Sequence, residues 1–384
     1  MIKVKKKVLI IGPIGDFGGQ EIEARNIIDA LSINYNVKLL STAPMTETSV
    51  AVYGMDCQHT CIHRELENSN LLLKVFSFLA KKKSNSSLPS YFLVSNKVSN
   101  RFFNFRDRGL QILKNEIDAM HIVLFCGTLE SGFLKEVISY CFETQNALVL
   151  RTTGKIDFIA EDIKELLTKI TAILVHSNLN ARNLKEIALS NIVVVDQTSL
   201  KESELLALPI DKPKNIIFGF IGRFSEEKGI IELLKAFSGI DAELVVAGGG
   251  NLIDEVQRLL SEKVTYLGEI ESNNIANFYN KIDVLIIPSH EEAGPLVGIE
   301  AMAAGKIIFS TQVGAMMERL SDTENDFWFD INTEQSLLKL IKRVRNLSPE
   351  EIKRIRESNR EVYLRNYSIE MISNRYLNIF GKLI

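Results

Sequence analysis

Residues 284–305 read VLIIPSHEEAGPLVGIEAMAAG, and this stretch decides the fold because it joins a strand, a loop and a helix. The apolar run Val284–Pro288 predicts a buried strand, and Ile299–Ala304 predicts a helix. Glu292 lies just past the strand, and Glu300 lies among small or apolar helical residues. A buried carboxylate needs a hydrogen-bonding partner, which the hydroxyl groups of a ligand would supply. The alternative is two surface glutamates, one on a loop and one on a helix.

The same alternation of apolar strands and amphipathic helices continues along nearly the whole chain, and it predicts the fold class α/β with parallel sheets. The expected strands are Val8–Ile11, Val37–Leu40, Ile122–Phe125, Ala147–Arg151, Ala172–His176, Ile192–Val195, Ile216–Ile221, Glu243–Ala247, Val264–Leu267, Val284–Pro288 and Ile307–Ser310. The expected helices include Glu21–Leu31, Lys135–Phe142, Ile230–Phe237, Ile253–Leu260, Ile275–Tyr279 and Ile299–Ala304.

Two Rossmann-like domains in tandem explain this series of elements. The first is expected at residues 1–205 and the second at 206–366, because the polar, proline-containing stretch Ser199–Asn215 is typical of an interdomain linker. Such sheets bind ligands beyond the carboxyl ends of their strands. Two of them face to face would therefore form a cleft in which the chemistry should take place.

Two further loops follow strands and open helices. In GRFSEEKG at 222–229, Arg223 and Lys228 lie beside a helix amino terminus, where the helix dipole favours carboxylates over cations. An anionic ligand would explain this placement, and a solvated loop is the alternative. In GPIGDFGGQ at 12–20, backbone N–H groups at the helix start could hold a phosphate, or the glycines serve only a tight turn.

Composition excludes several classes of protein. The 384 residues predict two or three domains, and a net charge of −3 provides no overall field that would attract nucleic acid, so no nucleic-acid partner is expected. The apolar runs are much shorter than the roughly 20 residues of a membrane span. The apolar run Val8–Ile11 after the basic start is also too short for a signal peptide, so a cytoplasmic protein is expected.

The four cysteines are too few and too irregularly spaced for a disulfide framework. Cys57, His59, Cys61 and His63 alternate, and thiolate and imidazole are the usual ligands of zinc. On an extended strand, however, the outer pair would lie about 20 Å apart. A half-buried strand is therefore expected here rather than a metal site.

One segment departs from the nearly neutral average. Residues 70–115 have nine basic residues and only one acidic residue, Asp107, so their net charge is +8, and aromatic residues are interleaved with the charges. Such a segment could contact an anionic membrane surface or hold an anionic acceptor. A solvated loop whose aromatic side chains pack inward is the alternative.

Four motifs together resemble a known family. These are Glu292-x7-Glu300 followed by AMAAG, GRFSEEKG at 222–229, VVAGGGN at 245–251 and YLG at 266–268. Their order and spacing are similar to those of the donor domain of GT-B glycosyltransferases of family 4, the group 1 glycosyl transferases. The resemblance implies a GT-B fold, in which two Rossmann-like domains face each other across a cleft and a last helix, here 367–384, crosses back to the first domain.

By this resemblance, Arg223 and Lys228 neutralise the donor's diphosphate in place of a metal, and no cofactor is expected. The chain contains no Asp-x-Asp motif, with which other transferases hold a metal. Glu300 would bind the ribose hydroxyls and Glu292 would face the transferred sugar, so Glu292, Arg223 and Lys228 are the expected catalytic residues. The other implied donor-binding residues are Gly222, Gly249, Tyr266, Leu267, Ala293, Gly294, Pro295, Leu296 and Val297, with Gly15, Gly18 and Gly19 from the first domain.

One position departs from the family. Many relatives have His-Gly close to the reacting sugar, where this chain has Thr153-Gly154, and threonine is no acid or base at neutral pH. Either no such group is needed, or Asp157 or His121 takes part, although His121 on an apolar strand favours a core histidine.

The expected function is retaining transfer of a sugar from a UDP- or GDP-sugar to a glycan or lipid-linked glycan, in the synthesis of cell-surface polysaccharide. A nucleotide-sugar 2-epimerase of the same fold and an inactive nucleotide-sugar binding protein are the alternatives.

Overall fold

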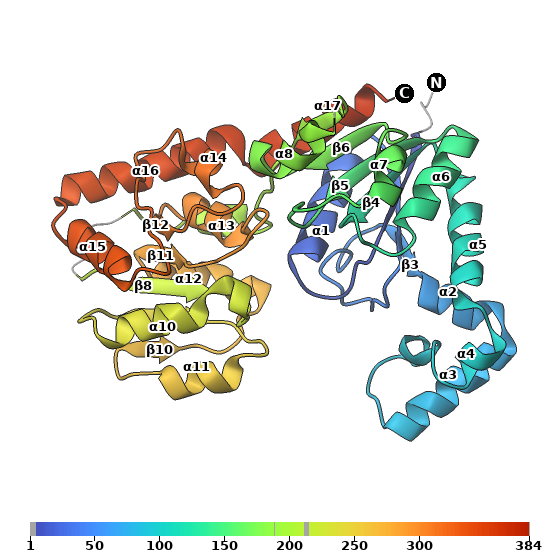
Figure 1. Ribbon diagram of the computed structural model, residues 1–384, viewed down its shortest axis with the longest axis horizontal. Helices are drawn as coiled ribbons and strands as arrows, with labels where there is room; N and C mark the ends of the chain where they lie inside the picture. Colours follow the sequence, from blue (N-terminus) through green and yellow to red (C-terminus); the bar gives the residue numbers. More distant parts are fainter. Residues whose placement is uncertain (1–4, 188, 211–214, 384) are drawn as a thin grey trace. The chain divides into compact units, whose positions relative to one another are not determined.

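The computed structural model describes residues 5–187, 189–210 and 215–383. These residues form two compact units (Figure 1). Unit 1 contains the chain up to residue 175, residues 181–195 and the chain from residue 373, and unit 2 contains residues 176–180 and 196–372. Among the described residues, no helix is long and apolar enough to cross a membrane.

Unit 1 is built on a sheet of seven parallel strands in the order β3-β2-β1-β4-β5-β6-β7. The strands are β1 (Lys7–Gly12), β2 (Asn36–Ser41), β3 (Gln58–Cys61), β4 (Ile122–Gly127), β5 (Ala147–Thr152), β6 (Ala172–Val175) and β7 (Ile192–Val194). The helices are α1 (Gly19–Ser32), α2 (Ile62–Ser69), α3 (Leu71–Ser84), α4 (Ser99–Phe102), α5 (Phe105–Ile117), α6 (Leu134–Thr144), α7 (Glu161–Leu167), α8 (Asn178–Glu186) and α17 (Ile369–Gly381). Every residue of β4 is buried, because helices cover both faces of a parallel sheet.

Unit 2 has five parallel strands in the order β10-β9-β8-β11-β12. The strands are β8 (Phe218–Ile221), β9 (Leu244–Ala247), β10 (Val264–Tyr266), β11 (Val284–Ile287) and β12 (Ile307–Ser310). The helices are α9 (Glu202–Leu206), α10 (Ile230–Ser238), α11 (Ile253–Leu259), α12 (Ile275–Lys281), α13 (Leu296–Ala303), α14 (Met316–Leu320), α15 (Glu334–Arg345) and α16 (Pro349–Asn366).

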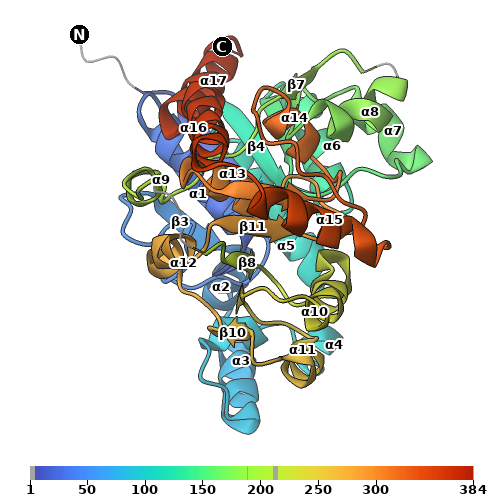
Figure 2. The ribbon, with the colours of Figure 1, turned by 90° about the vertical axis from the view of Figure 1, so that its left-hand side faces the viewer.

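The two faces of the unit 2 sheet carry separate cores, because successive strand residues point to opposite faces. Val284 and Ile286 pack with α10, α11 and α15, whereas Leu285 and Ile287 pack with α12 and α13. Figure 2 shows α10 and α15 on one side of these strands and α12 on the other. The strands are thus held rigidly from both sides, and the loops at their ends have a fixed base.

The prediction of an α/β fold with two parallel Rossmann-like sheets is confirmed. The linker expected at 199–215 is different, because it contains α9, whose Leu205 is fully buried in the core beside α13. Residues 211–214 of that stretch lie outside the described residues. The chain passes into unit 2 at residue 196, earlier than the boundary expected at 205/206.

Two further segments of unit 1 differ from their predictions. The strand expected at 57–63 is shorter, since β3 ends at Cys61 and His63 lies in α2. The basic segment 70–115 is mainly helical, with α3, α4 and α5, rather than a loop. Asn70 caps α3, because its side chain accepts hydrogen bonds from the backbone of Leu72 and Leu73.

The last helix, α17, is anchored in unit 1 from residue 373 onward, as the resemblance to the family implies. The hydroxyl of Tyr376 donates to Glu23 Oε1 over 2.7 Å, and Glu23 pairs with Arg151 over 2.9 Å. All three side chains are buried. The charged groups of this network therefore hold the helix against the sheet.

Candidate functional site

The candidate site of unit 2 lies at the carboxyl edge of its sheet, where the loops after β8, β9, β10 and β11 are hydrogen-bonded side by side. Phe224 N–H donates to Gly249 O over 2.7 Å, and Gly248 N–H donates to Gly268 O over 2.8 Å. His290 N–H donates to Glu227 O over 2.9 Å, which joins the β11 loop to the β8 loop. Predicted donor-binding residues from separate parts of the sequence therefore lie on one continuous surface.

Glycine is required where backbone segments of this surface approach each other, most closely at Gly248 and Gly229. Gly248 has a φ of +132°, and a Cβ atom there would lie 1.9 Å from Gly222 O. Gly229 has a φ of +65°, and its Cβ would lie 2.0 Å from Pro288 O. No other residue fits such close contacts with backbone atoms, so these glycines allow the loops to approach each other.

Lys228 and Glu292 form an ion pair in this structure. Both side chains are only partly exposed, at 27% and 12% respectively. Ser289 Oγ donates a further hydrogen bond to Glu292 over 3.2 Å. Arg223, in contrast, is exposed on the same loop as Lys228. The structure thus brings the expected catalytic Lys228 and Glu292 together and leaves the Arg223 side chain accessible from solvent.

Glu300 projects from α13 into the core and is 4% exposed. The Tyr279 hydroxyl lies 3.1 Å from Glu300 Oε2 and 2.9 Å from Val297 O. Burial raises the pKa of Glu300 to about 7, while the hydrogen bond from Tyr279 acts in the opposite direction. A carboxyl group whose pKa is near 7 can take or release a proton when a ligand approaches.

The remaining predicted donor-binding residues flank these groups. The hydroxyl of Tyr266 donates to Gly248 O over 2.9 Å, and Leu267 is 36% exposed. Residues 293–295 form the loop before α13, and residues 296 and 297 are the first two residues of that helix. They are half-buried apart from Pro295, which is buried. The Leu296 and Val297 N–H groups of the first turn of α13 lie at a positive helix end, while Gly298 N–H donates to Pro295 O over 3.0 Å.

In unit 1 the predicted loop Gly15, Gly18 and Gly19 follows β1 and leads into α1. Gly15 N–H donates to Glu21 Oε1 over 2.7 Å, so the buried carboxylate of Glu21 shapes the loop. The loop also meets the end of β5, since Thr153 Oγ1 donates to Gln20 Oε1 over 3.3 Å.

The two substitutes considered for the missing histidine lie elsewhere in unit 1. His121 is exposed at the amino end of β4, the opposite edge of the sheet from the glycine loop, so it is not a core histidine. It accepts a hydrogen bond from Lys7 N–H over 3.2 Å. Asp157 is exposed and pairs with Lys155 over 2.9 Å.

Sequence reasoning missed Tyr279, Arg319 and Asp196. Arg319 is fully buried, pairs with Asp196 over 2.6 Å and donates to Pro295 O over 2.5 Å. The available signal was two adjacent charged residues, Glu318 and Arg319, in the short, otherwise largely apolar run 313–320. Nothing in the sequence indicated its partners, which lie far from it along the chain.

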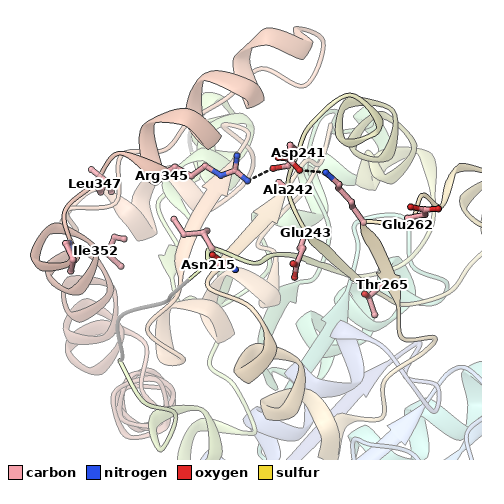
Figure 3. Close-up of a pocket in the computed structure, with 12 residues that line it drawn as sticks. Asn215, Asp241, Ala242, Glu243, Glu262, Thr265, Arg345, Leu347 and Ile352 are labelled. Atoms are coloured by element: carbon pink, nitrogen blue, oxygen red, sulfur yellow. Dashed lines mark hydrogen bonds and ion pairs between the residues drawn. The ribbon is translucent and has the colours of Figure 1, made fainter.

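A pocket of about 720 Å³ lies at the opposite edge of the unit 2 sheet (Figure 3). Asp241 and Glu243 precede β9, and Lys263 precedes β10, so these lining residues stand at the amino ends of the strands. Asp241 pairs with Lys263, and Arg345 donates to Asp241 O over 2.5 Å. Asp241 and Lys263 are thus paired with each other, away from the predicted site.

Among the described residues, no group of three or more His, Cys, Asp or Glu side chains could hold a metal ion. In the alternating segment, Cys57 is buried and donates to Val37 O over 3.4 Å. His59 pairs with Glu47 over 2.6 Å.

Comparison with solved structures identifies the class of fold. The chain resembles a glycosyltransferase crystal structure from Rickettsia africae, with a TM-score of 0.74 and 17% identity over 99% of this chain and 98% of the other. It also resembles the Anabaena protein HepE, solved in complex with UDP-glucose, with a TM-score of 0.69 and 13% identity over 98% and 99% of the two chains. The fold is therefore that of the GT-B proteins.

The sequence comparisons define the family more closely. Residues 206–362 match the family described as glycosyl transferases group 1. This part of unit 2 is a domain of that family, and the resemblance recognised in the sequence is confirmed.

Two curated relatives align with parts of the chain. An uncharacterized glycosyltransferase of Methanocaldococcus jannaschii is 30% identical over 181 residues, 44% of this chain and 45% of the relative. A lipopolysaccharide 1,2-N-acetylglucosaminetransferase of Salmonella typhimurium is 27% identical over 177 residues, 41% and 46% of the two chains. The chain thus spans about half the length of these curated relatives.

Proposed function

We propose that the protein is a retaining glycosyltransferase that moves a sugar from a nucleotide diphosphate to a glycan or lipid-linked glycan. The observation that carries this proposal is the carboxyl edge of unit 2, where Lys228 and Glu292 lie on segments that pack through glycines and Glu300 projects from the adjoining helix α13. The similarity to a protein solved with UDP-glucose supports a nucleotide sugar as donor. The similarity to a lipopolysaccharide transferase supports a role in cell-surface polysaccharide synthesis.

The diphosphate is the group most in need of stabilisation, because negative charge develops on it as the bond to the sugar breaks. Preorganised cations stabilise such charge most effectively where water is excluded. In this proposal the Lys228 ammonium exchanges its partner Glu292 for the diphosphate, and the exposed Arg223 closes on the same group. The two cations take the role of a metal, so the reaction proceeds without one.

The two glutamates have different roles in the proposal. Glu300 accepts hydrogen bonds from the ribose hydroxyls, and Glu292, released by Lys228, faces the transferred sugar. The backbone N–H groups of Gly294, Leu296 and Val297 at the start of α13 bind the sugar and the distal phosphate, since a helix amino terminus favours anions. Main-chain groups around Tyr266 contact the base, and the loop with Gly15, Gly18 and Gly19 closes over the donor.

No side chain is required as a general base. The bond from the anomeric carbon to the diphosphate breaks, the acceptor oxygen bonds to that carbon from the same face, and the acceptor's proton passes to the leaving phosphate. Retention follows from attack on the face that the leaving group occupies. Thr153 can therefore stand where relatives have histidine without loss of the reaction.

On the acceptor side we propose that segment 70–115 contacts an anionic membrane surface. The structure places an apolar face on α3, where Leu71, Phe78 and Leu79 are 77%, 60% and 55% exposed. Lys81, Lys82 and Lys83 follow in the last turn of the same helix, which contains no acidic residue. Apolar side chains beside a basic cluster are typical of helices that lie on anionic lipid.

Figure 1 shows α3 at the end of unit 1 that lies farthest from the strands of its sheet. The helix is therefore accessible to a flat surface without displacement of the unit 1 core. Nucleotide sugars are cytoplasmic metabolites, so this surface would be the inner face of the membrane.

Co-sedimentation with vesicles tests the membrane contact. Changing Lys81, Lys82 and Lys83 to Gln should weaken binding to phosphatidylglycerol vesicles at low salt by roughly tenfold or more, since each basic residue contributes about 1 kcal/mol. The matched control changes Lys339, Lys342 and Lys353, exposed on α15 and α16, to Gln and should bind like the wild type. Equal binding by both triple variants would refute the contact.

A screen of UDP- and GDP-sugars by thermal stabilisation tests the donor. A ligand at 100 times its dissociation constant adds about 2.7 kcal/mol to the free energy of unfolding. The stabilising sugar nucleotide is then incubated with and without glycan acceptors. Consumption that depends on acceptor supports the proposal, interconversion of the free sugar nucleotide identifies an epimerase, and binding without consumption identifies a binding protein.

A further inference from the structure

A fully buried arginine lies behind the loop that leads into α13. Arg319, in α14, has no exposed surface. Its Nε and Nη2 atoms donate to the two carboxylate oxygens of Asp196 over 2.8 and 2.6 Å. Its third nitrogen, Nη1, donates to Pro295 O over 2.5 Å. One guanidinium group therefore binds a carboxylate on one side and a loop carbonyl on the other.

Backbone contacts from the same segment reinforce this attachment. Ala315 N–H donates to Ala293 O over 3.0 Å. Gly314 has a φ of +50°, and a Cβ atom there would lie 2.5 Å from the same carbonyl oxygen. A Cβ atom on Gly294 would lie 3.0 Å from Arg319 Nη2. The loop 293–295 thus lies directly against α14 and the turn before it.

Asp196 fixes the guanidinium from a distant part of the chain. It is 123 residues from Arg319 in sequence, at the point where the chain enters unit 2 after β7. Gln197 N–H donates to Asp196 Oδ1 over 2.8 Å, which orients the carboxylate. The neighbouring Glu318 accepts hydrogen bonds from Leu179 N and Asn178 Nδ2, both over 3.1 Å, so α14 is held on a second side.

We propose that Arg319 is a positioning residue for the donor. Held by Asp196, it fixes the carbonyl of Pro295 and thereby the direction of the N–H groups of Leu296 and Val297 that follow. This inference rests on the proposed function, in which those amides bind the sugar and the distal phosphate. A guanidinium suits the task because its rigid, planar fork binds a carboxylate through two bonds and still has a donor for the loop.

A buried ion pair could also serve only the stability of the fold. Replacing both charges together distinguishes such a structural role from the proposed positioning role. Removing one partner of a buried pair is strongly destabilising, because it leaves the other charge buried and unpaired, whereas replacing both partners is often neutral. The double variant Arg319→Met with Asp196→Asn therefore keeps the fold while it removes the bond to Pro295 O. The new amide oxygen still accepts from Gln197 N–H.

Two measurements on the double variant test the proposal. Hydrogen exchange of the peptide covering 293–298 should be about tenfold faster than in the wild type, because the loop has lost its anchor. Titration with UDP and with GDP should show about tenfold weaker binding of the nucleotide that the wild type prefers, at a melting temperature close to wild type. The matched control is Arg356→Met, which removes another buried arginine of unit 2, one that donates to Gly305 O over 2.7 Å beyond the far end of α13. It should lower the melting temperature without changing exchange at 293–298.

Unchanged exchange and unchanged nucleotide affinity in a folded double variant would overturn the proposal. If that variant does not fold, Arg319→Lys decides, since a lysine keeps the charge but cannot bind Asp196 and Pro295 O together. Wild-type exchange and affinity in Arg319→Lys would likewise overturn it. A wild-type protein that binds neither nucleotide refutes the proposed function instead, and the exchange measurement still shows whether Arg319 holds the loop.

Discussion

The two units place charged residues at equivalent edges of their sheets and use them differently. At the carboxyl edge of unit 2, Lys228 and Glu292 pair while 27% and 12% exposed, so either can exchange its partner for a ligand. At the carboxyl end of β5 in unit 1, Arg151 and Glu23 pair with 0% and 2% of their side chains exposed. A partly exposed pair can open for substrate, whereas a fully buried pair must stay closed in the folded protein, because burying a lone charge is costly.

The largest effect should come from breaking the buried pair of unit 1. Arg151→Met leaves Glu23 charged and buried, so we expect a loss of about 3–5 kcal/mol in the free energy of unfolding, measured by denaturant titration. Lys164→Met, which removes an exposed pair with Glu161 on α7, should cost less than about 1 kcal/mol. Equal losses in the two variants would mean that the buried network does not anchor α17.

The corresponding change in unit 2 should affect activity rather than stability. Replacing Arg223 or Lys228 with Ala should lower kcat/KM by roughly 10²-fold or more, about 3 kcal/mol, because the leaving diphosphate loses a cation. Lys235→Ala, on an exposed position of α10, is the control and should keep wild-type kinetics. Near-normal kcat/KM in both site variants would remove these residues from the mechanism. Activity that disappears with EDTA would contradict the metal-free reaction.

Substitutions of Glu292 and Glu300 should have different effects within unit 2. Glu300→Gln should weaken binding of the bare nucleotide diphosphate by roughly tenfold or more, since hydrogen bonds to a charged group contribute about 1.5–3 kcal/mol. Glu292→Gln should leave that affinity nearly unchanged and lower kcat, because its partner is the sugar. Isothermal titration of both variants with UDP and GDP separates the roles, and equal losses of affinity would show that the roles are not separate.

A smaller effect should follow pH. Burial raises the pKa of Glu300 to about 7, so the folded protein holds this proton more tightly than the unfolded chain does. The stability contributed by the protonated group is complete below the unfolded pKa of about 4.3 and is lost as pH rises through 7. Relative to Glu300→Gln, the wild type should therefore lose stability between about pH 4 and 7.

Nucleotide affinity should change in the opposite direction, because ribose hydroxyls donate to the ionised carboxylate. Between pH 6 and 8 the wild-type affinity should rise by up to about tenfold relative to that of Glu300→Gln. Titrations of both proteins across this range measure the difference, which also cancels the titration of the diphosphate itself. Parallel pH profiles would show that ionisation of Glu300 does not contribute.

The elements around the site were predictable to the extent that each is encoded locally. The strand expected at Val284–Pro288 is observed as β11 at Val284–Ile287, because strands buried on both faces consist of continuous apolar runs. Glu300 was expected in a helix of small residues, and α13 has it there. The loop glycines could also be recognised from the sequence, because only glycine fits where two backbone segments approach this closely.

What the sequence did not reveal depends on residues that meet only in the folded chain. Lys228 and Glu292 were assigned to different parts of the donor, and their pairing across 64 residues has no local signal. The bond between Arg319 and Asp196 spans 123 residues. Segment 70–115 was expected as a loop or a membrane patch, and its helices are stabilised partly by caps and ring stacking, such as Phe76 on Phe102.

The central claim is that the carboxyl edge of unit 2 binds the diphosphate of the donor, and hydrogen exchange with and without UDP or GDP tests it most directly. We predict slower amide exchange on nucleotide binding in residues 222–229, 248–251 and 293–300. Residues 241–243 and 262–265, which line the pocket at the opposite edge (Figure 3), should exchange as before. Protection at that pocket, with none at 222–229 and 293–300, would contradict the account.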